Sequence, residues 1–235
     1  MNNNRNIISK SWVFDKKVAK KFDEHVAQSV PFYSNFQKHI AKLSEFFLKD
    51  GAVIYDIGCS TGNTIKEICK LKVKRKTTII GIDKSKTMIK IAKIKLSKYK
   101  KFNIKLLSSD IEKYKFGKCN LVISVLIFPF LTLKQRKIIL KKIYNKLEIG
   151  GALITIEKVR SDTGIMEDIL NQLYFDFKQE KNLSGNDILR KAKSLRTAFN
   201  IYDQTQTIRF LQNSKFKKID IFFNKFNFVG IIAIK

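Results

Sequence analysis

Three aspartates and two glycines in the first half of the chain have the spacing of a ligand-binding crevice. The first of them, Asp56, lies near the end of the apolar segment 52–58 and precedes Gly58 and Gly62. Glycine permits a tight turn and lets a ligand approach the backbone closely. The turn has neither the G-x-G-x-x-G spacing that favours a pyrophosphate nor a G-x-x-x-x-G-K-[ST] phosphate loop. An acid ahead of such a turn suits a cationic ligand better than a phosphate.

Two further aspartates continue this pattern along the chain. Asp83 closes the apolar segment 77–83, 21 residues after Gly62, where an acid can accept both hydroxyls of a ribose. Asp110 closes the segment 103–110, where its carboxylate can accept a hydrogen bond from an adenine amine. A single aspartate after a strand is usually a turn or cap residue. Three at the ends of successive strands converge on one crevice, so we predict a nucleoside site.

Alternating strands and helices must position these acids. Apolar segments alternate with amphipathic ones from residue 51 to residue 158, which predicts a doubly wound α/β sheet. The strands are expected at 52–58, 77–83, 103–110, 120–128 and 152–158, and the helices at 64–71, 85–99 and 133–151, the last of them stopped by Gly150 and Gly151. Two final strands, 216–223 and 226–235, are expected to form an antiparallel hairpin linked by Asn224 and Lys225.

Helical segments flank and interrupt this alternation. Residues 21–49 have helical periodicity, broken by a turn at Pro31. We expect a single domain over 1–235, with an N-terminal helical cap at 1–49 and an inserted helical pair at 161–203. The first helix of that pair places five apolar side chains on one face: Ile165, Ile169, Leu170, Leu173 and Phe177.

The charge balance has two interpretations. Lys and Arg number 47 against 20 Asp and Glu, a formal net charge of +27, and residues 66–105 are especially basic. Clustered cations favour a nucleic-acid partner. The alternative is a compositional bias toward Lys, Ile, Asn and Phe; only seven of the 47 cations are Arg, the residue that nucleic-acid readers prefer for bidentate contacts. We favour the compositional interpretation.

Other classes of protein are excluded by composition. The longest apolar run, 121–131, is 11 residues long, whereas a membrane helix needs about 20. The N-terminus has no apolar signal core, so we expect a cytoplasmic protein without membrane contact. The three cysteines are odd in number and sparsely spaced, which argues against disulfides and for a reducing compartment. With two histidines and no Cys/His ligand spacing, no metal site is expected.

The motifs DIGCSTG, GID and SSD, in this order, resemble class I S-adenosylmethionine-dependent methyltransferases. The resemblance implies a Rossmann-like sheet of seven mostly parallel strands, with the last strand antiparallel. Further segments narrow it to the carboxy-S-adenosyl-L-methionine synthase family: FDEHVAQSVPFYSN, YDIGCSTG, GIDKSKTMI, SDI, KIYNKLEIGGALITIEK, DFK and NFVGIIAIK. That family is cytosolic and commonly dimeric. It makes carboxy-S-adenosylmethionine from S-adenosylmethionine and prephenate, for carboxymethylation of the tRNA wobble uridine.

The resemblance also implies a set of cofactor contacts. We add Gly62 to the expected cofactor-binding residues because it is part of the glycine turn. At Lys84, where the family often has Asn, the backbone is expected to make the contact; Tyr33 is alternatively a core aromatic residue. The residues that match the family's cofactor contacts are Tyr33, Gly58, Cys59, Ser60, Asp83, Lys84, Asp110 and Ile111.

Two positions depart from the family pattern. Val125 replaces an Asn at the end of the fourth strand, and Ala192 replaces an Arg that grips the carboxylate of the carboxylated cofactor. Ala cannot bind a carboxylate bidentately, as Arg does. Arg196 lies one helical turn after Ala192 and is our candidate for a substitute substrate anchor. Alternatively, Arg196 is exposed or pairs with Asp203 or Glu180.

Three functions remain open. The first is a methyltransferase-type enzyme that uses S-adenosylmethionine to transfer a one-carbon group to an unidentified acceptor, tRNA or a small molecule; the segment 191–196 resembles methyltransferases of unassigned substrate. Because the sulfonium already activates the methyl group, no separate catalytic residue need be evident. The second is carboxy-S-adenosyl-L-methionine synthesis from prephenate, with another cation in place of the missing Arg. The third is a nucleic-acid-binding protein with a relic cofactor pocket. A homodimer is expected from the resemblance.

Overall fold

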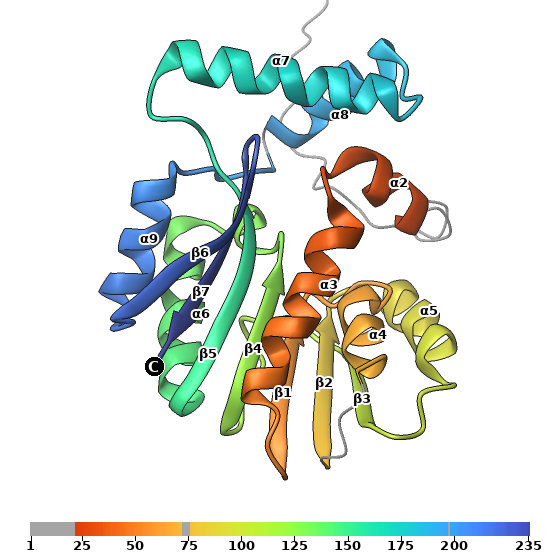
Figure 1. Ribbon diagram of the computed structural model, residues 1–235, viewed down its shortest axis with the longest axis vertical. Helices are drawn as coiled ribbons and strands as arrows, with labels where there is room; N and C mark the ends of the chain where they lie inside the picture. Colours follow the sequence, from red (N-terminus) through yellow and green to blue (C-terminus); the bar gives the residue numbers. More distant parts are fainter. Residues whose placement is uncertain (1–21, 72–75, 197) are drawn as a thin grey trace, which may run out of the picture.

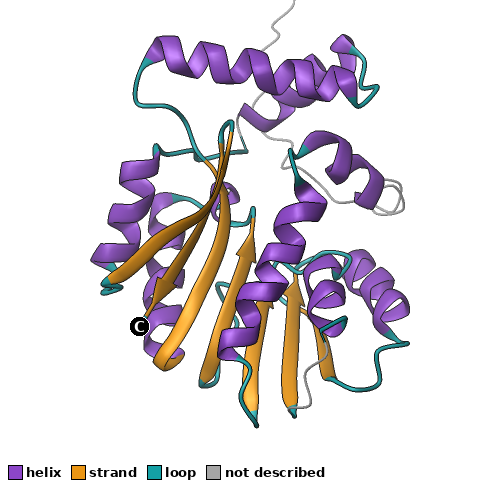
Figure 2. Cartoon of the chain, in the orientation of Figure 1, coloured by secondary structure: helices purple, strands orange, loops and turns teal. Residues whose placement is uncertain are grey.

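The computed structural model describes residues 22–71, 76–196 and 198–235, and one sheet organises them (Figures 1 and 2). Its strands are β1 (Ala52–Ile57), β2 (Thr77–Asp83), β3 (Asn103–Ser108), β4 (Cys119–Val125), β5 (Leu147–Lys158), β6 (Lys218–Lys225) and β7 (Phe228–Ile234). Their spatial order is β3-β2-β1-β4-β5-β7-β6. β1 to β5 pair in parallel, whereas β7 runs antiparallel to both β5 and β6. This topology confirms the predicted fold class.

Helices cover both faces of the sheet. They are α2 (Phe22–Ser29), α3 (Tyr33–Ser44), α4 (Asn63–Cys69), α5 (Lys86–Leu96), α6 (Leu133–Lys146), α7 (Gly164–Glu180), α8 (Gly185–Arg196) and α9 (Gln204–Asn213). Helices α3, α4 and α5 contribute apolar side chains to the core on one face, and α6 and α9 to the core on the other. Figure 1 shows α7 and α8 lying across the carboxyl end of the sheet, above β4 and β5.

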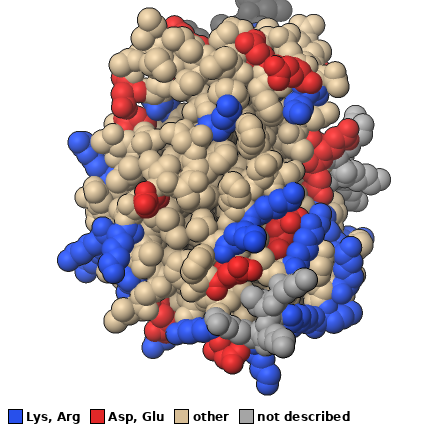
Figure 3. Space-filling view, viewed as in Figure 1, with Lys and Arg blue, Asp and Glu red and all other residues tan. Residues whose placement is uncertain are grey.

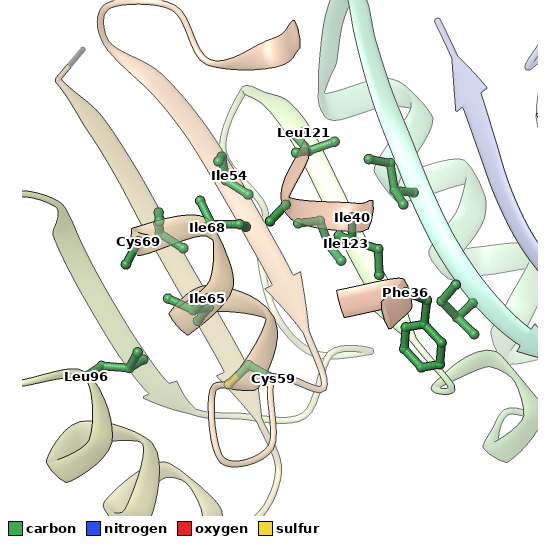
Figure 4. Packing of buried hydrophobic residues seen from close by; sticks show 14 of the residues in the cluster. Phe36, Ile40, Ile54, Cys59, Ile65, Ile68, Cys69, Leu96, Leu121 and Ile123 are labelled. Carbon is green, nitrogen blue, oxygen red and sulfur yellow. The ribbon is translucent and has the colours of Figure 1, made fainter. Parts of the chain in front are cut away.

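The central strands are apolar on both faces because both faces are covered. Ile54 of β1 and Leu121 of β4 pack with Ile40 and Ile65 in one core, all of them fully buried (Figure 4). Parallel strands buried in this way read as continuous apolar runs rather than as alternating ones. The core therefore anchors the carboxyl ends of β1 and β4, where the predicted crevice lies.

Two predicted boundaries are wrong. Helix α6 ends at Lys146, and not at the glycines, because Leu147 already has extended backbone angles and begins β5. Gly150, with φ +78°, instead lies inside β5 near a register shift against β4. At the hairpin, β6 continues through Lys225, so residues 226–227 form the link.

Helix α7 does not bury the apolar face expected of it. Ile165, Ile169 and Leu173 are 72%, 47% and 43% exposed, and the helix has no fully buried residue. Its contact with the core is made by Tyr174, whose ring lies 5.4 Å from that of Phe228. Phe177 adds a second ring contact, 6.3 Å from Phe226, so the helix contacts the sheet through aromatic side chains and leaves Ile165, Ile169 and Leu173 exposed.

Candidate active site

The glycine turn after β1 has a left-handed backbone at three positions. Gly58, Ser60 and Gly62 have φ of +69°, +49° and +80°. A Cβ atom on Gly58 would lie 1.9 Å from Cδ1 of Ile127, and one on Gly62 would lie 2.8 Å from Cδ1 of Leu96. Glycine is needed at both places because no other residue combines this backbone with so little space. The N–H groups of Gly58 and Cys59 donate to the Ile82 carbonyl at 2.7 Å and 3.0 Å, so these hydrogen bonds hold the turn against the end of β2.

Asp83 connects this turn to the end of β2. Its Oδ2 accepts a hydrogen bond from the backbone N–H of Ser60 at 2.9 Å, and its Oδ1 accepts one from Ser85 at 2.8 Å. Burial raises the pKa of Asp83, while these two N–H groups act in the opposite direction. A carboxylate has about four acceptor positions, so this one can still accept from ribose hydroxyls.

Asp56 is the most deeply buried acid of the three. Asp56 is 1% exposed, and its Oδ2 has no hydrogen-bond partner among the described residues. Burial raises the pKa of Asp56 well above its usual range, and the charge of Asp83 raises it further. A buried acceptor without a partner is costly unless a ligand compensates it. The sulfonium and ammonium groups of S-adenosylmethionine suit this position, so the residues present fit that cofactor.

The end of β3 lies beside the end of β2, where the third predicted acid follows it. Asp110 accepts a hydrogen bond from the backbone N–H of Glu112 at 2.9 Å, and Ile111 is half-buried beside it. The N–H of Ser109 donates to the Asp83 carbonyl at 3.0 Å, which joins this strand end to that of β2. Lys84 has an exposed side chain, consistent with a contact through its backbone.

Tyr33 and Cys59 approach the turn differently. The Tyr33 hydroxyl accepts a hydrogen bond from Asn63 Nδ2 at 3.3 Å, and its ring packs edge-on against Phe36, so it contacts both the turn and the core. Burial raises the pKa of Tyr33 to about 12. The Cys59 thiol lies in the apolar core, and burial raises its pKa well above the usual value. The Cys59 side chain therefore belongs to the core, and its backbone N–H and carbonyl hold the turn through hydrogen bonds with Ile82 and Gly62.

A polar network behind the turn was missed by the sequence analysis. Asp23 of α2 accepts hydrogen bonds from Thr61 Oγ1 at 2.5 Å and Asn63 Nδ2 at 3.0 Å, and it forms an ion pair with Lys95 of α5. Burial would raise the pKa of Asp23, but the hydrogen bonds from Lys95 and Thr61 lower it. In the sequence, Asp23 has only the pattern of an ordinary acid in the first turn of a helix. No neighbouring residue therefore indicates the network.

The residues that depart from the family pattern lie around β4 and α8. Val125 ends β4 and is half-buried; Ala192 is half-buried on α8. Arg196 is exposed at the end of α8. In the ranges that the structure covers, Arg196 forms no ion pair with Asp203 or Glu180. Asp203 instead caps α9. The role of Arg196 as a substrate anchor stays a prediction.

Comparison with known proteins agrees with this geometry. Residues 54–151 match a family described as Methyltransferase domain. A carboxy-S-adenosyl-L-methionine synthase from Staphylococcus epidermidis is 36% identical over 225 residues, which cover 95% of this chain and 97% of the relative. The synthase of the same name from Sulfurimonas denitrificans is 35% identical, covering 97% of this chain and 96% of that one. The chain belongs to the carboxy-S-adenosyl-L-methionine synthase family.

Solved structures show the same fold. Human N-acetylserotonin methyltransferase in complex with S-adenosylmethionine superposes with a TM-score of 0.63 at 17% identity; the match covers 94% of this chain and 56% of the human one. Haemonchus contortus phosphoethanolamine N-methyltransferase 2, also with S-adenosylmethionine, gives 0.64 at 13% identity, covering 94% and 57%. This member of the synthase family is an S-adenosylmethionine-dependent transferase, and S-adenosylmethionine is its cofactor.

No helix in the described part of the chain is both long and apolar enough for a membrane span.

Proposed function

We propose that this protein makes carboxy-S-adenosyl-L-methionine from S-adenosylmethionine and prephenate. The end-to-end similarity to a synthase of that name, 36% identity over 95% of the chain, carries the proposal. The acids at the ends of β1, β2 and β3 support it, because we assign them to the cofactor that the reaction needs.

The reaction balances without an added oxidant or reductant. Prephenate loses its ring carboxyl group as CO2 and its ring hydroxyl group as hydroxide, and its ring becomes aromatic in phenylpyruvate. The cofactor methyl group gives a proton to the hydroxide, forming water, and its carbon bonds to CO2. The protein's part is to hold the two substrates in contact and to exclude bulk water.

Each residue of the crevice has a proposed contact with the cofactor. Asp83 accepts from the ribose hydroxyls, Asp110 from the adenine amine, and the Gly58–Ser60 backbone lies along the methionine portion. Asp83→Ala removes a charged acceptor and is expected to weaken cofactor binding by about 1.5–3 kcal/mol, measured by calorimetry. Glu112→Ala, at an acid beside the same strand ends, is the matched control. Unchanged affinity in Asp83→Ala would contradict the placement.

Ordinary methyl transfer is the second candidate. It is favoured by Val125 and Ala192, which stand where the family has an Asn and a carboxylate-binding Arg. Purified protein is supplied with S-adenosylmethionine and prephenate, and the cofactor is then analysed by mass spectrometry. Carboxylated cofactor is expected. If none forms and a methylated acceptor is found instead, methyl transfer replaces synthesis as the function.

We further propose that the product serves tRNA modification and that the basic surface contributes only weak tRNA binding. Figure 3 shows Lys and Arg side chains around α4 and α5 with acidic side chains among them, a mixed surface rather than a continuous basic groove. The logarithm of tRNA affinity should fall with the logarithm of salt concentration, with a slope of about −0.7 to −0.9 per neutralised phosphate. Tight binding of one tRNA at physiological salt would favour a nucleic-acid-binding role.

A cytoplasmic homodimer completes the proposal. Cys59, Cys69 and Cys119 are buried free thiols, which suits a reducing compartment. The exposed side chains of Ile165 and Ile169 on α7 form an apolar face typical of a subunit contact. Ile169→Glu should convert a dimer into a monomer in sedimentation analysis, and a monomeric wild type would contradict this part of the proposal.

A further inference from the structure

One lysine of α5 contacts three acceptors at the end of the glycine turn. The Nζ of Lys95 donates to Thr61 Oγ1 at 2.9 Å and to Asn63 Oδ1 at 2.7 Å, and it forms an ion pair with Asp23. An ammonium group has three N–H donors, so these contacts use all of them. Only 20% of the Lys95 side chain is exposed. Lys95 is therefore part of the packed structure behind the turn rather than a solvated surface cation.

The acceptors of Lys95 are also bonded to one another. Asp23 Oδ1 accepts from Thr61 Oγ1 at 2.5 Å and from Asn63 Nδ2 at 3.0 Å. Burial lowers the pKa of Lys95, whereas the hydrogen bond to Asp23 and the charge of that acid raise it. A polar network in which each member fixes the others holds a geometry more firmly than its separate pairs do. We call Asp23, Thr61, Asn63 and Lys95 the turn clamp.

The turn clamp holds the residues on either side of Gly62. This glycine is the N-cap of α4, with φ +80°, and it has no side chain to cap the helix. Glycine has the least restricted backbone of all residues. Thr61 is 1% exposed and precedes it, Asn63 begins α4 after it, and both are bonded to Asp23 and Lys95. Side chains from α2 and α5 thus restrain the turn at the residue whose backbone is least restricted.

The turn clamp also reaches Tyr33 at the start of α3. Asn63 Nδ2 donates to the Tyr33 hydroxyl at 3.3 Å as well as to Asp23. Phe32, the N-cap of α3, has a left-handed backbone with φ +56°, which is uncommon for a bulky residue. The Asn63 amide therefore joins the helices before and after this strained link. It also fixes the tyrosine that is expected to contact the cofactor.

Helix α2 buries little side-chain surface of its own. Its buried residues are Val26 and Ser29, in a helix of eight residues. At its far end the Ser29 carbonyl accepts a hydrogen bond from the Tyr174 hydroxyl of α7 at 2.6 Å. Figure 1 shows α2 between the helical pair α7–α8 and helix α4. Polar contacts at both ends therefore contribute much of what holds α2 beside the glycine turn.

We propose that Asp23 and Lys95 are positioning residues for S-adenosylmethionine. They act through Thr61, Asn63 and Tyr33, because the turn clamp fixes the glycine turn and the tyrosine in the geometry that receives the methionine portion of the cofactor. This inference rests on the proposed function, in its placement of the cofactor at the turn. It applies to carboxylation and to methyl transfer alike, since both reactions bind the same cofactor.

The test removes each charge of the ion pair separately. Lys95→Met removes the ammonium group at similar side-chain length, and Asp23→Asn removes the negative charge but keeps an amide oxygen. Lys93→Met on α5 and Glu24→Gln on α2 change exposed charges and are the matched controls. The dissociation constant of S-adenosylmethionine is measured by calorimetry without a second substrate. We expect it to rise about fivefold or more in Lys95→Met, about threefold or more in Asp23→Asn and less than about twofold in the controls.

Further measurements separate positioning from a purely structural role. Lys95→Arg keeps the charge and several N–H donors and should recover part of the affinity. The double variant should bind within about twofold of Lys95→Met, because the two side chains act as one unit. Amide hydrogen exchange of residues 61–64 in the free protein should be faster in Lys95→Met than in Lys93→Met. Should Lys95→Met fail to fold in thermal unfolding, Asp23→Asn, at a side chain that is 47% exposed, carries the test.

Unchanged affinity in both Lys95→Met and Asp23→Asn, or effects that add in the double variant, would overturn the inference. Asp83→Ala tests the placement of the cofactor separately. If that variant loses affinity and the two clamp variants do not, the placement stands and the turn clamp is only structural. If the clamp variants lose affinity and Asp83→Ala does not, the ribose placement fails and the positioning role stands. Because no prephenate is present, a failure of the carboxylation assay leaves these results unaffected.

Discussion

Two neighbouring residues of β5, the buried Glu157 and the half-buried Lys158, carry opposite charges on opposite faces of the sheet and have different surroundings. Glu157 forms an ion pair with Arg136 at 2.8 Å, and their side chains are 3% and 1% exposed. The Arg136 guanidinium also lies 5.2–5.4 Å from the centres of three aromatic rings: Phe128, Tyr202 and Phe210. The Nζ of Lys158, one residue later, instead lies 4.6 Å from the centre of the Tyr174 ring, which Lys178 Nζ also approaches, at 3.9 Å.

The difference separates a charge neutralised by an ion pair from a charge that forms none in the described part of the chain. Burial raises the pKa of Glu157, and Arg136 counteracts this only in part. The pair nevertheless neutralises itself inside the protein, and removing one partner would leave a buried charge alone. Lys158 forms no ion pair among the described residues, and the charge of Glu167 offsets only part of the lowering of its pKa by burial and by Lys178.

Breaking the ion pair should have the largest effect on stability. Arg136→Met leaves Glu157 buried without its partner, and we expect the free energy of unfolding to fall by about 3–5 kcal/mol in urea denaturation. Arg209→Met, an exposed arginine on α9, is the matched control and should change it by less than about 0.5 kcal/mol. A loss below about 1 kcal/mol in Arg136→Met would mean that the pair is not structural.

The second-largest effect is expected in the pH dependence of stability, which should distinguish Lys158 from the Glu157–Arg136 pair. Burial and the charge of Lys178 together lower the pKa of Lys158 from 10.5 to about 8, although the charge of Glu167 acts in the opposite direction. Above pH 8 the folded protein has released this proton while the unfolded chain still holds it, so Lys158 adds stability as the pH rises toward 10.5.

Other groups act in the opposite direction and must be subtracted. Burial raises the pKa of Cys69 and Cys119 to about 12, so these thiols reduce stability as the pH rises above 9. They titrate alike in wild type and in Lys158→Met. The unfolding free energy of wild type relative to that variant should therefore increase by roughly 2 kcal/mol between pH 8 and pH 10. A constant difference would contradict the buried charge.

The smallest effect is expected from Lys158→Met at pH 7. Removing an uncompensated buried charge should leave the free energy of unfolding unchanged or raise it by about 1 kcal/mol, because methionine fills a similar volume beside Tyr174. Urea denaturation without added anions is the measurement. If stability instead falls by more than about 1 kcal/mol, the ammonium group has an internal partner, and the contrast with Glu157 is lost.

Local patterns account for what could be predicted. Strand–helix alternation, the glycine turn and the acids at Asp56 and Asp83 were all readable, because apolar periodicity and turn chemistry depend on residues close together in sequence. The end of α6 was predicted too late in the chain because Gly150 and Gly151 are typical helix-stop residues, whereas the extended backbone already begins at Leu147. The exposure of the α7 apolar face was equally unreadable, since periodicity shows that side chains share a face but not what covers it.

The sequence by itself therefore determined the sheet, its order of acids and the type of cofactor. Only the tertiary structure decided which charged side chains are buried and which residues they contact. Among 47 Lys and Arg residues, nothing local distinguishes Lys95, Lys158 and Lys178 or selects Arg136 for pairing. These residues come together from strands and helices far apart in the chain, and both their burial and their mutual electrostatics exist only after those elements have packed.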